Sequence, residues 1–364
     1  MHRISSTLDA QSDPEVFLQM AEHFITNKHY DKAAEMYVFS KAFSRALELC
    51  ASEGVVLTDE MAESMSSDAN CRNLSQEERT ALLRQIADIA KDQGNWNLAC
   101  KKYTQIGERL KAMKMLMRGG DVNKVIFFAN HSRNAEIYTL AGNFLQSQNW
   151  HTDPNIYKHI VSFYTKAKAF GNLISFTDAF AQLQIDENRN YYEAWRALHE
   201  CVDLLERNRD AVYGGGAVMV KEEDLRSRRD VIEQVVRAIK LLADSAADAE
   251  KAKELIAVCS DLIKRSRPSH QDSSIISAAI RIGDVFALLV RYYYENARSA
   301  KDAMRVIDSM VKHAVEPRFF VERGLLEAVC SEDGRSVDEF FTEDAGELPA
   351  KRTGGNQKKT GEAV

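Results

Sequence analysis

The sequence is poor in the residues that interrupt helices. Its 364 residues include only 5 prolines and 17 glycines. Proline breaks a helix from within and glycine weakens it, so this scarcity argues against a sheet with many turns and favours long helices. Valine and isoleucine occur mostly at helical spacing beside Ala, Leu, Met, Glu and Lys. The sequence therefore predicts an all-α fold.

Signals for secretion, membrane insertion and nucleic-acid binding are also missing. The opening MHRISSTLDA has no apolar centre, so it does not resemble a secretory signal peptide. No apolar run approaches the ~18 residues of a membrane span. The formal net charge is -6, and no basic stripe carries interleaved aromatic residues. We expect no nucleic-acid partner and no direct membrane insertion.

The six cysteines are widely spaced, and no two form a CxxC pair: Cys50, Cys71, Cys100, Cys201, Cys259 and Cys330. An even number of cysteines is compatible with disulfides. Without a secretory signal, however, such spacing fits buried free thiols in a reducing compartment better.

Motifs for catalysis and metal binding fail on inspection. His199 and Glu200 begin an HExxH zinc motif, but the second histidine would fall at Asp203. Gly214 to Gly216 follow no predicted strand and precede no GK[ST], so a linker is a better interpretation than a phosphate loop. We predict no catalytic residue, no cofactor, no metal site and no enzymatic activity.

An internal repeat is the strongest signal that is present. Shifting the chain by 66 residues aligns Phe17–Gly54 with Leu83–Gly120, and a third, partial copy begins near Ile137. The positions expected to pack the repeats are Ala21, Tyr30, Ala33 and Tyr37 in the first copy, Ala87, Trp96, Ala99 and Tyr103 in the second, and Ala141 and Trp150 in the third. Small residues let paired helices approach and aromatic residues fill the space between units, as in tetratricopeptide repeats of about 34 residues. The sequence predicts a right-handed solenoid of antiparallel helix pairs.

Capping residues mark where these helices begin and end. Asp13–Pro14 and Asp153–Pro154 are typical helix starts, Ser75 and Glu78 form a capping box, and Gly54 and Gly120 stand where a helix should stop. Asp153 replaces the alanine of the other copies. We therefore expect a longer loop or a displaced second helix in the third copy.

The predicted organisation has four parts. Residues 1–12 form a flexible start, and 13–185 the tetratricopeptide-like repeats. Residues 186–330 form degenerate helical repeats, with a flexible loop near 208–220 and long helices at about 222–244 and 247–264. Residues 331–364 form an acidic, then basic, disordered tail.

Two groups of residues are candidates for partner contacts. Lys101, Lys102 and Lys111 form a basic group that is either a binding patch or an ordinary exposed helix face. Phe319 and Phe320 are either exposed anchors or a cap on the last helix pair, and we favour the cap.

Several stretches resemble the C-terminal tetratricopeptide region of the intraflagellar transport protein 140 family. The densest runs from Leu82 to Trp150 and includes ACKKYTQIGERLKAM; others are LTDEMAESM, FYTKAKAF and IRIGDVFALLVRYY. The resemblance covers roughly residues 17–329. It weakens at Gly214–Gly216 and after Ser331, and no cysteine-paired zinc module of the sister subunits is present.

The resemblance implies a scaffold subunit of intraflagellar transport complex A, which acts in retrograde transport and cargo entry in cilia and flagella. It implies other complex A subunits as partners, with ciliary membrane-cargo adaptors as a further class, and a location in the cilium and at its base. Family members carry two β-propellers ahead of the repeats, so we expect this chain to be a C-terminal fragment or a truncated gene model. The alternatives are a free-standing adaptor that binds peptides or cargo proteins in its groove, and a subunit of another transport or coat complex.

Overall fold

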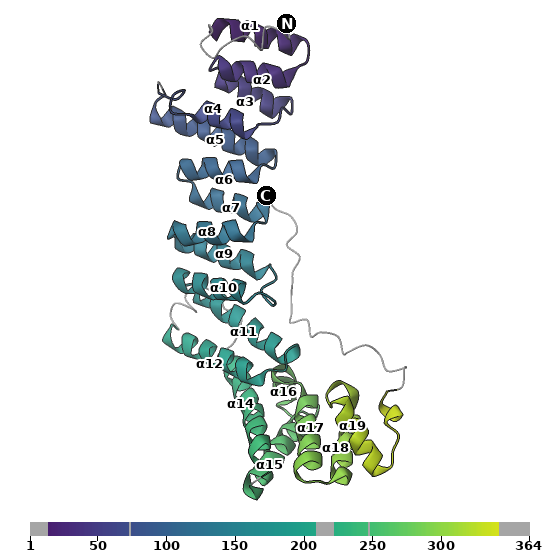
Figure 1. Cartoon of the computed structure of the whole chain (residues 1–364). Coiled ribbons are helices and arrows are strands. Elements are labelled where there is room, and N and C mark those ends of the chain that lie inside the picture. Colours follow the sequence, from purple (N-terminus) through teal and green to yellow (C-terminus); the bar gives the residue numbers. More distant parts are fainter. Residues whose placement is uncertain (1–13, 73, 209–221, 247, 342–364) are drawn as a thin grey trace. The chain divides into compact units, whose positions relative to one another are not determined.

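The predicted all-α fold is confirmed. The computed structural model describes residues 14–72, 74–208, 222–246 and 248–341, and these residues form eighteen α-helices and no strand (Figure 1). The chain divides into two compact units, Met1–Ala169 and Phe170–Val364. The expected flexible start at 1–12 and most of the expected loop near 208–220 lie outside the described residues.

The first unit is a succession of short helices that pack against their neighbours in the chain, except that α4 packs on α2 and α5 rather than on α3 (Figure 1). They are α1 (Pro14–Thr26), α2 (Tyr30–Phe39), α3 (Phe43–Ser52), α4 (Asp59–Ser66), α5 (Gln76–Asp92), α6 (Trp96–Gln105), α7 (Arg109–Gly119), α8 (Val122–Ser132), α9 (Ala135–Gln146) and α10 (Pro154–Ala167). Helices α1 to α3 and α5 to α7 are the two copies found at an offset of 66 residues. Helix α6 begins and ends 66 residues after α2 begins and ends, so the repeat is present in the structure as well as in the sequence.

The capping signals predicted at Ser75, Asp153 and Gly120 operate in the structure, whereas Asp13 lies outside the described residues. The Ser75 hydroxyl accepts from the amide of Glu78, and the Glu78 carboxylate accepts from the amide of Ser75, which completes a capping box on α5. The Asp153 carboxylate caps α10 through the amide of Asn155. Gly120 ends α7 in the left-handed conformation with φ 73°, where glycine is favoured because it has no Cβ.

Left-handed corners repeat with the helices. Lys28 (φ 59°) and Lys41 (φ 62°) follow α1 and α2, and Gly94 (φ 77°) and Gly107 (φ 82°) follow α5 and α6 at the same offset. The geometry of each corner is therefore kept although the residue changes.

The third copy has the longer loop that Asp153 led us to expect. Residues 147–153 separate α9 from α10, whereas 27–29 and 93–95 separate the equivalent helices of the other copies. Trp150 lies in this loop and is buried, while Trp96 opens α6. The aromatic position is retained, but it no longer starts a helix.

The second unit has longer helices around a central one. Its helices are α11 (Phe170–Asp186), α12 (Tyr191–Arg207), α14 (Glu222–Asp244), α15 (Ala249–Arg265), α16 (Ser273–Ala279), α17 (Ile282–Arg291), α18 (Ala300–Lys312) and α19 (Arg323–Asp333), with the short turns η1 (Tyr292–Asn296), η2 (Pro317–Phe319) and η3 (Val337–Phe340). Helix α14 packs against α12, α15, α16 and α17, and it spans the predicted residues 222–244. Its buried stripe includes Val231, Val235 and Ala238.

Two expected boundaries differ from the structure. The units divide after Ala169 and not after residue 185, because α11 packs extensively against α12. Disorder from Ser331 is wrong for the first part of the tail, because α19 continues to Asp333 and η3 follows it. Residues 342–364 of the expected tail lie outside the described range.

Among the described helices, none is individually long and apolar enough to cross a membrane. Only the pair Ser273–Ala279 and Ile282–Asn296, bent by 76°, meets the requirements of length and composition when taken together.

Candidate functional site

Small and aromatic side chains hold the helix pairs of the first unit together. Ala21, Ala33, Ala87, Ala99 and Ala141 are all fully buried. Tyr37, Tyr103 and Trp150 are buried, whereas Tyr30 and Trp96 are half-buried. The structure thus places all ten of these side chains wholly or partly inside the stack, where they are not available to a substrate.

Tyrosine hydroxyls tie the second helix of a pair to the first. The Tyr103 hydroxyl on α6 donates to the Asp88 carboxylate on α5, and the Tyr164 hydroxyl on α10 donates to Asn143 Oδ1 on α9 at 2.9 Å. Desolvation, and secondarily Asp88, raise the pKa of Tyr103 well above its ordinary value. The hydroxyl therefore stays protonated and serves as a structural donor.

Basic side chains cover some of the same aromatic rings. The Lys111 ammonium lies 5.6 Å from the Tyr103 ring centroid, and the Arg45 guanidinium lies 5.8 Å from that of Tyr37. These pairs are equivalent in the two copies. Such contacts stabilise the repeat by about 0.5–1 kcal/mol each at exposed sites.

Lys101 and Lys102 are neighbours with different environments. The Lys101 side chain is 58% exposed and its ammonium pairs with Glu63 Oε1 at 2.9 Å. The Lys102 side chain is fully buried, with its ammonium 3.0 Å from Glu63 Oε1 and 2.6 Å from Ser66 Oγ. Hydrogen bonds from Lys101 and then Lys102 lower the pKa of Glu63. Lys102 is therefore a contact between α4 and α6, and the interpretation of it as a surface residue is wrong.

Other lysines also link alternate helices. Lys124 Nζ on α8 donates to Asn97 Oδ1 on α6 at 3.0 Å, and Lys166 Nζ on α10 donates to Asn130 Oδ1 on α8 at 3.3 Å. With Glu63 and Lys102, these bonds connect α4, α6, α8 and α10 in turn. The sequence pattern missed this ladder because the partners lie 27 to 39 residues apart.

The basic group therefore reduces to Lys101 and Lys111 as exposed side chains. Lys111 is 54% exposed and pairs with Glu108 Oε2 at 2.8 Å. A residue that the sequence did not single out lies on the next helix: Phe127 of α8 is 66% exposed, with its ring 4.1 Å from that of His131. Lys101, Lys111 and Phe127 lie on three successive helices, α6, α7 and α8, and we refer to these three exposed residues together as the α6–α8 surface.

Phe319 and Phe320 lie in packed positions within the second unit. The Phe320 ring packs on Gly283 of α17 so closely that a Cβ there would lie 2.4 Å from it. The Arg281 guanidinium lies 4.9 Å from the Phe320 centroid. The Phe319 carbonyl accepts a hydrogen bond from Arg189, and the Arg318 guanidinium lies 4.6 Å from the Phe319 centroid. Both side chains are half-buried, and these contacts favour a cap over exposed anchors.

A buried polar cluster adjoins the Phe320 ring. The Tyr191 hydroxyl donates to Asp284 Oδ2 at 2.6 Å, and Arg281 and Arg189 face the same carboxylate at 4.0 and 3.8 Å. Desolvation raises the pKa of Asp284, although the hydrogen bond from Tyr191 and the two arginines oppose the shift. The cluster joins the loop between α11 and α12 to the start of α17.

All six cysteines are buried and free. Burial raises the pKa of Cys201 and of Cys259 to about 12 and that of Cys50 to about 11, with nearby carboxylates adding to the shift at Cys201 and Cys50. These thiols therefore stay protonated at neutral pH and are poor nucleophiles. Among the described residues, no three His, Cys, Asp or Glu side chains are grouped to hold a metal ion.

Stacked helix pairs with alanines at the crossings and aromatic wedges define a helical-repeat protein of the tetratricopeptide class. Two family models match the chain. One is the tetratricopeptide domain shared by intraflagellar transport proteins 140 and 172, over residues 1–163, and the other is the C-terminal tetratricopeptide domain of protein 140, over residues 171–311. The chain belongs to the intraflagellar transport protein 140 family. Membership implies a ciliary protein associated with intraflagellar transport complex A, and domains of this kind are typically non-catalytic scaffolds.

Proposed function

We propose that the chain is a non-enzymatic scaffold of intraflagellar transport complex A, which supports retrograde transport and cargo entry in cilia and flagella. The observation that carries this proposal is the pair of matches to the intraflagellar transport protein 140 family, which follow one another along most of the chain. The proposed partners are other complex A subunits, with ciliary membrane-cargo adaptors as a second class. The proposed location is the cilium and its base, on the cytoplasmic side.

The α6–α8 surface is the contact area that we assign to this scaffold in the first unit. It combines exposed cations with an exposed aromatic side chain, and aromatic and basic residues dominate the energetics of protein interfaces. Lys101 and Lys111 already pair with Glu63 and Glu108, so an acidic group of a partner would have to share these cations with the two glutamates.

The test is affinity purification of the tagged chain from flagellated cells, followed by mass spectrometry. We expect the complex A subunits to co-purify in stoichiometric amounts, and loss of the protein to give short cilia with swollen tips. The double variant Lys101→Glu, Lys111→Glu should lose most of these subunits. The matched control is Lys253→Glu on α15, a lysine that is 74% exposed and also paired with a glutamate.

Two outcomes would contradict the proposal. Recovery of the chain without any complex A subunit would reject membership of the complex. Recovery of a lone chain that binds short peptides would favour the alternative of a free-standing adaptor. If the double variant keeps all the subunits, the α6–α8 surface is not the contact, although the scaffold role would stand.

A further inference from the structure

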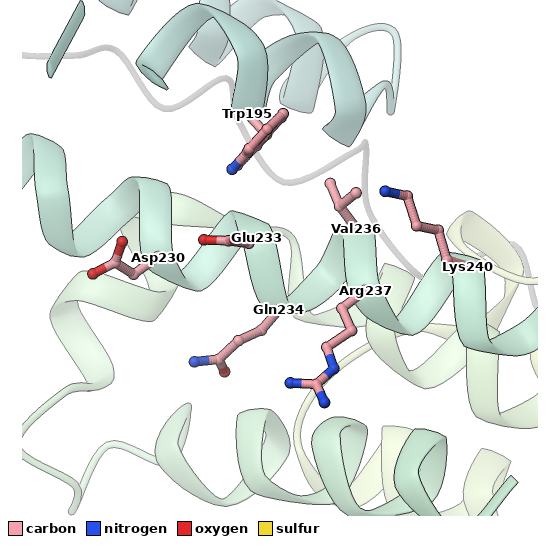
Figure 2. Close-up of a pocket in the computed structure, with 7 residues that line it drawn as sticks. All are labelled: Trp195, Asp230, Glu233, Gln234, Val236, Arg237 and Lys240. Carbon is pink, nitrogen blue, oxygen red and sulfur yellow. The ribbon is translucent and has the colours of Figure 1, made fainter. Parts of the chain in front are cut away.

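A groove of about 520 Å³ lies between α12 and α14 in the second unit (Figure 2). Trp195 of α12 forms one wall, and residues of α14 between Asp230 and Lys240 form the other. Trp195 is half-buried, with its ring stacked on that of His199 at 5.3 Å and tilted against that of Tyr192 at 6.1 Å. The groove is thus built around one fixed aromatic side chain.

Some of the polar residues in the groove are already engaged. Arg237 pairs with Glu254 of α15, Gln234 accepts from Arg265 at 3.4 Å, and Asp230 pairs with Arg229. Figure 2 shows Arg237 and Gln234 directed away from Trp195. These residues hold α14 in place and contribute little to recognition.

Three other residues of α14 present a different pattern. Glu233, Val236 and Lys240 follow one another at spacings of three and four, so they lie along one face of the helix. Within the described part of the chain, neither Glu233 nor Lys240 has an ion pair or a hydrogen bond. The groove therefore has an unpaired anion and an unpaired cation about 10 Å apart along α14. Val236 lies between them and is only 8% exposed, so it contributes the edge of a largely buried apolar side chain.

Trp195 contributes the remaining unsatisfied group. Its indole nitrogen is buried and has no hydrogen-bond partner among the described residues. In Figure 2 this nitrogen is turned toward α14, on the side of Glu233. A carbonyl oxygen that reaches this nitrogen would satisfy a buried donor, and pairing a buried donor is favourable.

We propose that this groove docks an amphipathic segment of a partner protein. The segment places an apolar side chain against Trp195 and Val236, a basic residue against Glu233 and an acidic residue against Lys240, and a carbonyl oxygen accepts from the indole N–H. Charge complementarity selects this occupant, because the two unpaired groups have opposite signs and lie at opposite ends of the groove. The inference does not depend on membership of complex A, since it rests only on the second unit.

The test uses the full chain with ¹⁵N-labelled tryptophan and synthetic peptides. The three tryptophans give three indole resonances, and Trp195→Phe identifies the one from Trp195. The matching peptide presents Lys, Leu and Glu on one helical face at the spacing of Glu233, Val236 and Lys240. The comparison peptide carries Lys at both charged positions. It therefore presents the same charges to the groove whether it lies parallel or antiparallel to α14.

The matching peptide should shift the Trp195 resonance saturably and leave those of Trp96 and Trp150 in place. Lys240→Glu should weaken this binding about tenfold and should make the comparison peptide the better ligand. Lys253→Glu, which lies on α15, should change neither affinity.

Several results would overturn the proposal. One is a Trp195 resonance that does not move with either peptide. Another is an equal shift of all three resonances, which would indicate non-specific binding. A third is a Lys240→Glu variant that still binds the matching peptide more tightly than the comparison peptide. Occupation of the groove by another segment of the same chain would give the first of these results.

Discussion

Individual residues explain the close approach of α9 and α10. Gly142 lies inside α9, where glycine normally weakens a helix by about 0.5–1 kcal/mol relative to alanine. A Cβ at this position would lie 2.6 Å from the ring of Tyr164. The absence of a side chain is therefore what allows the Tyr164 hydroxyl to reach Asn143.

Gly142→Ala should lower the free energy of unfolding by about 1–3 kcal/mol, because overpacking outweighs the gain in helix propensity. Gly324→Ala on α19 is the matched control, since no atom lies within 4 Å of a Cβ there. It should be neutral or stabilising by a few tenths of a kcal/mol. Urea unfolding followed by circular dichroism measures both, and an equal stabilisation by the two variants would show that Tyr164 moves aside at no cost.

The environment of Lys102 was predictable only in part. Its equivalent in the first copy is Met36, which is also buried, so the repeat itself indicates an interior position. The sequence could not identify Glu63 and Ser66 as its partners, because contacts between helices depend on how the helices pack. The prediction that Lys102 lies at the surface was wrong because it relied on the charge of the side chain and not on its position in the repeat.

Elements were easier to predict than contacts. The bounds of α14 match the prediction because apolar spacing is a local signal. The loop of the third copy was foreseen from Asp153, but the burial of Trp150 in that loop was not. The position of a side chain in a loop depends on the neighbouring helices, which local signals do not encode.

The left-handed corners give a prediction at the scale of elements. Residues other than glycine in this conformation cost roughly 1–2 kcal/mol. Lys28→Gly and Lys41→Gly should therefore each raise the free energy of unfolding by about 1 kcal/mol. Gly94→Lys and Gly107→Lys should lower it by a similar amount, since open space around both glycines leaves only the backbone cost.

Thermal unfolding of the four single variants measures these changes in the free energy of unfolding. Lys32→Gly, within α2, is the control and should be destabilising by about 1 kcal/mol, as expected for glycine in a helix. If the glycine variants at residues 28 and 41 were also destabilising, the lysine side chains would have to make contacts that outweigh the backbone cost.

The division of the chain into two units is consistent with the pairing of α11 with α12 inside the second unit. The first family match ends at residue 163 and the second begins at residue 171. The division between the two compact units, after Ala169, falls between them. The predicted boundary falls after residue 185, because the regular repeats fade there. The point where a sequence repeat fades shows only that the residue pattern changes. The end of a structural unit is set by which helices pack together, and α11 packs with α12.

Fragments test this division. Residues 1–169 should fold with cooperative thermal unfolding, and so should residues 170–364. A fragment of residues 1–185 should aggregate, because α11 then exposes Ile174, Ala181 and Ile185 without its partner helix. Circular dichroism and light scattering distinguish these outcomes. A soluble, monomeric 1–185 fragment with 186–364 equally well folded would favour the later boundary.

The burial of Lys102 has a practical consequence for mapping this protein in its assemblies. Amine-reactive cross-linkers and acylating reagents need a solvent-accessible ammonium group. They will modify Lys101 and Lys111, whereas Lys102, one residue away, is shielded by α4. Missing cross-links at Lys102 would therefore carry no information about a partner, and rapid modification of Lys102 would report that α4 has separated from α6.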